Sequence, residues 1–275
     1  MRLGAILGLS NAQGASLEPG DLAEVARTIE RQGFDSAWVF DAVGRGFLLP
    51  DPLSALAVAA TVTGHIELGT GVLQVPIRPT FDIAQRAATT ALVSGGRLLL
   101  GIGSGSTAED FAACEADYER RMATFARRGV ELRALLRGED VQGRNLHPWA
   151  SLGQGPPVLI GSWAGSRWIE RAATEFDGWV GSAAKTSWAI LSEGITRFRA
   201  AGGSRAVATN IAVDLNVADD HAPGGNDPVT LRCTPVQAAA RLHRLRDLGF
   251  DDAVLVVSRP NDASLAALRA LLPRP

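Results

Sequence analysis

The chain has 275 residues, with 27 basic and 29 acidic side chains and a formal net charge of −2. This length suffices for one large α/β domain or two smaller ones. The balanced charge, with no run of one sign, excludes a nucleic-acid-binding surface and a basic membrane patch. No segment approaches the roughly twenty apolar residues of a membrane span, so we expect no membrane association and a small-molecule substrate.

Cysteine and histidine patterns argue against a metal centre. Cys114 and Cys233 lie far apart and lack the spacing of a zinc site or a redox pair, and the four histidines never pair at ligand spacing. We therefore expect no bound metal. Two free thiols suit a reducing compartment, so we expect the protein in the cytoplasm.

Short apolar runs alternate with longer segments of helical period along the whole chain, which is the pattern of βα units around a parallel sheet. The stretch after Met1 loosely imitates a signal peptide, but its two glycines and single arginine favour a strand. The strands are predicted over 3–9, 34–40, 66–75, 97–103, 157–162, 177–182, 208–217 and 251–258. The helices are predicted near 18–33, 51–63, 81–94, 107–137, 166–176, 187–201, 234–248 and 262–272.

Eight strands, each followed by a helix, are the number that closes a (β/α)8 TIM barrel, and the length lies within the usual range of that fold. No linker or compositional break divides the chain, so we predict a single domain over 1–275. An open, doubly wound sheet is the alternative, because one sequence does not reveal the order of its strands.

The stretch "GGRLLLGIGSGSTAED" (95–110) raises the question of a dinucleotide fingerprint, because Gly103, Gly105 and Ala108 satisfy G-x-G-x-x-A. The context contradicts that interpretation: the next strand begins only at 157, far beyond one βαβ unit. In a barrel these glycines lie at the C-terminal end of the fourth strand, where active sites form. Without side chains they can admit a flat ring or a phosphate, although a tight turn alone also explains them.

Two more strand ends are rich in glycine. The third strand runs into "GTGVLQVPIRPT", where glycines and a proline interrupt the strand, and the fifth runs into "GSWAGS" before a helix whose N-terminus can accept a phosphate. The one lysine among the basic residues, Lys185, follows the sixth strand in "GSAAKTSW". Arg45, Arg78 and Arg259 also fall near predicted strand ends.

The blocks "FDSAWVFD", "IELGTGVLQVPIRPTFDIAQRAATTALVSGGRLLLGIGSGS", "PPVLIGSWAG", "IERAATEFDGWV" and "LGFDDAVLVV" follow one another through nearly the whole chain. In this order they resemble the bacterial luciferase-like superfamily of flavin and deazaflavin oxidoreductases, in its F420-dependent branch. The resemblance implies a barrel whose cofactor, coenzyme F420 or alternatively FMN, lies over the C-terminal strand ends. Relatives often dimerise through barrel helices, so the resemblance allows a homodimer.

The resemblance also implies roles for particular residues. A non-proline cis peptide that backs the cofactor ring would join Gly71 and Val72. Gly103, Ser104 and Gly105 match the segment that lines the cofactor, and Gly161, Ser162 and Trp163 match the loop near its phosphate. Lys185 lies where some relatives bind an anion, although an exposed lysine without such a role is an equally good interpretation.

One departure concerns proton transfer. Many deazaflavin-linked relatives carry a histidine directly after the acid that ends the second strand, whereas Asp41 is followed here by Ala42. Asp41 then becomes the candidate acid, base or hydrogen-bonding residue, with a loop acid or water as alternatives.

We therefore expect hydride transfer between F420 and a small organic substrate. The alternatives are an FMN-dependent monooxygenase, a Schiff-base aldolase that uses Lys185, and a barrel that binds flavin without catalysis. The substrate pocket is expected in the loops 10–16, 42–50 and 218–232.

Overall fold

The computed structural model describes residues 1–8, 17–257 and 260–272. Eight parallel strands form a closed barrel, because the last of them, β10, pairs with both β1 and β8. In barrel order the strands are β1 (Arg2–Ile6), β2 (Ser36–Val39), β3 (Glu67–Thr70), β5 (Leu98–Gly103), β6 (Val158–Ser162), β7 (Gly178–Ser182), β8 (Ala206–Asp214) and β10 (Asp252–Val256). A two-residue strand, β9 (Leu231–Arg232), extends β8. The predicted (β/α)8 barrel is confirmed, and the doubly wound alternative is wrong.

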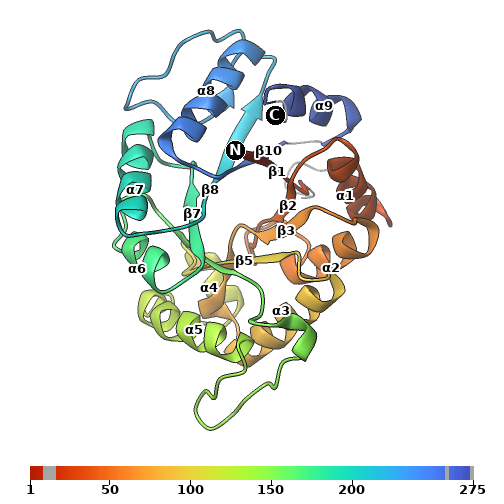
Figure 1. The fold of residues 1–275 in the computed structure, drawn as a ribbon, viewed down its shortest axis with the longest axis vertical. Coiled ribbons are helices and arrows are strands. Elements are labelled where there is room, and N and C mark those ends of the chain that lie inside the picture. The colour runs from red at the N-terminus through yellow and green to blue at the C-terminus, as the bar shows by residue number, and fades with distance from the viewer. Residues whose placement is uncertain (9–16, 258–259, 273–275) are drawn as a thin grey trace.

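The helices surround the strands in chain order (Figure 1). The helices between successive barrel strands and after the last one are α1 (Asp21–Arg31), α2 (Pro52–Val62), α3 (Thr80–Val93), α5 (Arg121–Leu136), α6 (Trp168–Thr174), α7 (Trp188–Ala200), α8 (Pro235–Leu248) and α9 (Asp262–Ala270). Short turns of helix are η1 (Val75–Ile77), α4 (Ala108–Ala113) and η2 (Ala150–Leu152). Local sequence explains several ends: the Thr234 hydroxyl caps α8 ahead of Pro235, and Gly249, with φ 105°, ends it.

Two predicted elements are divided in the structure. The third strand stops at Thr70 and resumes as β4 (Leu73–Gln74), and both pieces pair with β5. The peptide bond between Gly71 and Val72 in this gap is cis, as the resemblance implied.

The single helix predicted over 107–137 is wrong, because the chain forms α4 and α5 with a turn between them. Glu115 adopts a left-handed φ of 52°, which α-helical backbone does not tolerate, so α4 ends before it. The Asp117 carboxylate then accepts a hydrogen bond from the Arg120 N–H, just ahead of α5.

The barrel interior is filled by large apolar side chains. Trp38 is wholly buried at its centre, and its indole N–H donates to the Ser36 hydroxyl at 2.8 Å. Six further side chains complete this interior cluster: Ile6, Leu99, Leu159, Val180, Val207 and Val254. A second, larger apolar cluster lies between the strands and the helices. The barrel is therefore a packed core, and a ligand can enter only at its ends.

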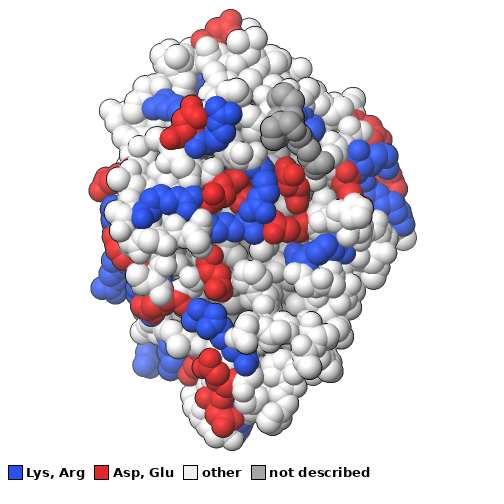
Figure 2. Space-filling view, viewed as in Figure 1, with Lys and Arg blue, Asp and Glu red and all other residues white. Residues whose placement is uncertain are grey.

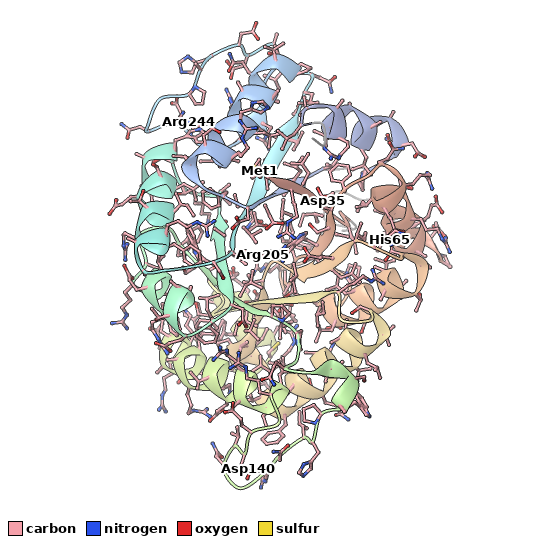
Figure 3. The ribbon with its side chains drawn as sticks, in the orientation of Figure 1. Met1, Asp35, His65, Asp140, Arg205 and Arg244 are labelled. Carbon is pink, nitrogen blue, oxygen red and sulfur yellow. The ribbon has the colours of Figure 1, made fainter. Side chains whose placement is uncertain are left out.

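Ion pairs close the N-terminal end of the barrel. Arg2 and Arg205 each pair with Glu67 and Asp252, and Asp252 is wholly buried. Burial raises the pKa of the Asp252 carboxyl, and the two arginines only partly offset it. Figure 2 shows basic and acidic side chains interleaved across this face, and Figure 3 places Arg205 near its centre, close to Met1 and Asp35. The opposite, C-terminal end is thus left for a functional site.

Among the described residues, no helix combines the length and the apolar character needed to cross a membrane.

Candidate active site

A cavity of about 530 Å³ opens at the C-terminal ends of the strands. Its volume lies in the range of small-molecule and cofactor pockets. It brings together every residue that the sequence predicted for the site: Asp41, Gly71, Val72, Gly103, Ser104, Gly105, Gly161, Ser162, Trp163 and Lys185. The glycine-rich turns that are scattered along the sequence therefore converge on one pocket.

The floor of this cavity includes Val72, whose side chain fits between two glycines of neighbouring strands. A Cβ atom on Gly103 would lie 2.5 Å from Val72 Cγ2, and one on Gly161 would lie 2.6 Å from Val72 Cγ1. Both distances are far shorter than an ordinary van der Waals contact. The glycines thus leave room for Val72, and the surface offered to a ligand is the valine side chain more than bare backbone.

The turn after β5 requires glycine at position 105 for a different reason. Its φ of 73° is left-handed, and a Cβ atom there would lie 2.6 Å from the side-chain oxygen of Gln74 and 2.8 Å from the Phe111 ring. Only glycine meets both the conformation and the space.

Asp41 lies on the cavity wall, but its carboxylate is already engaged. Arg78 donates to both oxygens, at 2.6 and 2.8 Å, and the Gln74 main-chain N–H donates at 2.8 Å. The Asp41 side chain is only 2% exposed. Burial alone would lower the pKa of the Arg78 guanidinium, but the hydrogen bonds and charge of Asp41 raise it above its ordinary value. The Asp41 carboxylate is therefore held in a bidentate ion pair with Arg78.

A second buried carboxylate, Asp110 in α4, escaped the sequence analysis. Arg45 donates to both of its oxygens, the Val43 N–H donates at 3.1 Å, and the Gln74 side-chain amide donates at 2.8 Å. Burial raises the pKa of Asp110, but the hydrogen bonds from Arg45 and Gln74 outweigh burial and lower it. An acid in the first turn of a helix normally indicates helix-dipole stabilisation, so the sequence carried no sign of this contact.

Two residues that line the cavity each carry a buried side-chain oxygen that lacks a hydrogen-bond partner among the described residues. These oxygens are Oε1 of Gln74 and Oγ1 of Thr209. A buried acceptor or hydroxyl without a partner is costly and uncommon, and in a binding cavity it indicates a missing ligand group or water. An isoalloxazine or deazaflavin ring, with an apolar face and a polar edge, fits a cavity that has an apolar floor and two such oxygens.

The mouth of the cavity carries the remaining predicted residues. Trp163 is 46% exposed, and Lys185 is also exposed, with a left-handed φ of 56°. The Ser162 hydroxyl accepts a hydrogen bond from the Trp179 indole, and helix α6 begins only at Trp168 and has seven residues. The loop after β6 therefore lies at the cavity as predicted, but helix α6, which follows it, is short.

Only one of the three loops predicted to form the pocket is seen to do so. Loop 42–50 contributes Ala42, Arg45, Phe47 and Leu49, whereas residues 218–232 do not line the cavity. Residues 10–16 and Arg259 lie outside the described residues. Among the described residues that line the cavity, the ionisable side chains are Asp41, Arg45 and Lys185.

Comparisons with known proteins agree with this architecture. A family model described as luciferase-like monooxygenase matches residues 1–222. Over 118 residues, 40% of this chain and 34% of the relative, the sequence is 36% identical to an F420-dependent glucose-6-phosphate dehydrogenase of Amycolatopsis mediterranei. Over 101 residues, 36% of this chain and 26% of the relative, it is 31% identical to the oxygenase component of a flavin-dependent trigonelline monooxygenase of Acinetobacter baylyi.

The fold is also found in the solved structure of an F420-dependent secondary alcohol dehydrogenase in complex with an F420–acetone adduct. The TM-score is 0.79, the identity is 16%, and the match covers 99% of this chain and 98% of that one. The matches to these two curated relatives span about a third or less of the length of each relative. Since the family model covers most of the sequence, the chain belongs to the luciferase-like monooxygenase family.

Proposed function

We propose that the protein is an oxidoreductase that binds coenzyme F420 and transfers a hydride between this deazaflavin and a small organic substrate. The cavity at the C-terminal strand ends carries the proposal, because its floor is the apolar Val72 and because two residues that line it, Gln74 and Thr209, carry buried side-chain oxygens without a partner among the described residues. The preference for F420 over a flavin rests on the sequence resemblance and on the F420-dependent relative.

Each part of the cavity has a defined task in this proposal. Val72 supports the face of the ring, while Gln74 and Thr209 hydrogen-bond with its polar edge. Lys185 at the mouth offers a positive charge for the cofactor phosphate. When bound, the deazaflavin supplies the carbon that gives or accepts the hydride, and the chain orients it toward the substrate.

Asp41 acts in this proposal as a positioning residue. Its main-chain oxygen accepts from the Gln74 amide nitrogen at 3.2 Å, and Asp110 accepts from the same nitrogen at 2.8 Å. Both protons of that amide are thereby used, so Oε1 of Gln74 is held as a fixed acceptor. The proton that accompanies the hydride is exchanged with water, because Ala42 replaces the histidine of many relatives.

An FMN-dependent monooxygenase is the second candidate, favoured by the similarity to a flavin-dependent oxygenase component. The Schiff-base aldolase has less support, because Lys185 is exposed and lacks the burial that makes a lysine amine nucleophilic. A barrel that binds flavin without catalysis differs from the proposal only in turnover.

Titration of the purified apoprotein with F420 and with FMN, followed by absorbance, tests the cofactor. We expect saturable binding of F420; tight binding of FMN without binding of F420 would overturn the proposal. Turnover is then measured as loss or gain of F420 absorbance with a library of alcohols, aldehydes, enones and imines. Binding of F420 with no turnover across that library would favour the non-catalytic barrel.

Lys185→Ala and Arg167→Ala form a matched pair of charge deletions. Both side chains are exposed, but only Lys185 lines the cavity. A charged hydrogen bond contributes about 1.5 kcal/mol or more, so we expect Lys185→Ala to weaken F420 binding roughly tenfold, and Arg167→Ala to leave it within about twofold. Equal effects of the two variants would remove Lys185 from the site.

A further inference from the structure

One wall of the cavity is apolar. Phe40, at the end of β2, and Phe47 and Leu49, in loop 42–50, line the cavity together. Phe40 also packs against the apolar cluster inside the barrel. A molecule that lies against this wall meets two aromatic rings and a leucine.

The charged groups on this side of the cavity are neutralised within the protein. Asp41 pairs with Arg78, and Arg45 pairs with the wholly buried Asp110, each through both nitrogens of a guanidinium fork. A charge already paired at short distance offers little net attraction to another ion. Within the described part of the chain, this wall therefore carries no unpaired charge that could bind a phosphate or a carboxylate of a substrate.

Among the described residues that line the cavity, the cation without an ion-pair partner is Lys185, on the other side. Lys185 follows β7, and β7 lies four strands from β2 in the eight-stranded barrel, which is the opposite position. Among the described residues, the Lys185 ammonium has no hydrogen-bond or ion-pair partner. The described unpaired cation thus lies across the cavity from Phe40, Phe47 and Leu49.

The apolar wall is held in place by the protein. Asp110 accepts hydrogen bonds from the Val43 N–H and from the Arg45 side chain, which fixes the start of loop 42–50 against α4. Gly44, with φ 77°, allows this approach, because a Cβ atom there would lie 2.5 Å from the Ala113 side chain. Phe47 and Leu49 are therefore presented by an anchored segment.

We infer that the substrate of this site is uncharged and carries an alkyl or aryl group that packs on Phe40, Phe47 and Leu49. This class differs from the phosphorylated sugar in the name of the F420-dependent relative. The inference rests on the proposed function for the reaction, whereas the binding it predicts depends only on the wall.

Methyl ketones from 2-butanone to 2-octanone serve as probes, with glucose 6-phosphate as the polar counterpart. Calorimetry on the full chain without cofactor gives the dissociation constant of each ketone, and glucose 6-phosphate is added as a competitor. Burying one methylene corresponds to about fourfold in affinity, so we expect the dissociation constant to fall roughly fourfold per carbon until the wall is covered. We expect glucose 6-phosphate not to displace 2-octanone.

Three variants assign the effect to the wall. Phe47→Ala is expected to weaken 2-octanone binding about tenfold and to flatten the dependence on chain length, while Phe47→Leu keeps that dependence. Leu48→Ala is the matched control, because Leu48 is 72% exposed and does not line the cavity. The affinity of the Leu48→Ala variant for 2-octanone should stay within about twofold of that of the unaltered chain.

The inference is overturned by affinities that do not change with chain length, by displacement of 2-octanone by glucose 6-phosphate, or by equal effects of Phe47→Ala and Leu48→Ala. These outcomes are independent of the proposed function. If the protein fails to bind F420 while the ketone series behaves as expected, only the proposal that F420 is the cofactor is overturned. If the protein binds F420 but prefers glucose 6-phosphate to the ketones, only the inference of an apolar substrate is overturned.

Discussion

Replacing Gly103 by alanine tests the arrangement on which the cavity floor depends. The new Cβ atom would lie 2.5 Å from Val72 Cγ2, about 1 Å inside ordinary contact, while the backbone at Gly103 is not left-handed. Forcing such an atom into a packed site costs about 1–3 kcal/mol. Val72→Ala alone removes two methyl groups from a half-buried side chain, which costs about 1 kcal/mol.

The double variant with Gly103→Ala and Val72→Ala distinguishes a clash with the Val72 methyls from a general effect of replacing Gly103. Without the valine methyls, the nearest atom to the new Cβ is Cβ of residue 72 at 3.6 Å, an ordinary contact. Gly103→Ala should then cost less than about 0.5 kcal/mol in the Val72→Ala background, a coupling of about 1–2 kcal/mol. Thermal unfolding of the four proteins, followed by circular dichroism, measures it, at about 2–4 °C per kcal/mol for a chain of this size.

Gly64→Ala is the control, because no atom lies within 4 Å of its added Cβ and its backbone is not left-handed. It should change the melting temperature by no more than about 2 °C. Strictly additive losses in the double variant would refute the explanation, since they would mean that Val72 and the methyl at position 103 do not compete for one space. Titration with F420 gives a second measurement, because a displaced Val72 raises the floor and should weaken binding, and Val72→Ala should restore it.

The Asp110 carboxylate accepts from a main-chain N–H and from an arginine, so its removal should destabilise the protein. Asp110→Ala leaves the Val43 N–H without its acceptor and the Arg45 charge without its partner. Because Arg45 is partly exposed, we expect a loss of about 2–3 kcal/mol in the free energy of unfolding. Asp262→Ala, in an exposed ion pair, should lower the melting temperature much less, and equal melting temperatures of the two variants would contradict this. The pKa values of the Asp110 and Asp51 carboxyls lie below their ordinary value of 3.8, since the hydrogen bonds from the arginines that they accept outweigh the effect of burial. Their contribution to stability is therefore complete above about pH 4 and is lost as the pH falls through the folded-state pKa values, so the melting temperature should drop on acidification below pH 4. Asp110→Asn should drop less steeply over that range, and an unchanged slope would count against the assignment.

The sequence by itself determined the barrel and the place of its site. The alternation of apolar runs with helical segments depends only on neighbouring residues, and eight repeats leave few ways to close a sheet. Because the C-terminal ends of parallel strands meet at one end of a barrel, Gly71, Gly103, Gly161 and Lys185 could be assigned to one pocket. Boundaries were less certain: the split of 107–137 into α4 and α5 depends on the left-handed Glu115, and glutamate carries no sign of that conformation.

Only the tertiary structure decided what the side chains in the pocket contact. Asp41 meets Arg78 from 37 residues away, and Asp110 meets Arg45 from 65 residues away, in a chain whose 27 basic residues include a single lysine. With so many arginines, no local pattern selects a partner for a given acid. The same holds for Val72, which occupies the space that Gly103 and Gly161 leave open. Such contacts depend on the register and twist of neighbouring strands, and these are set only when the whole barrel closes.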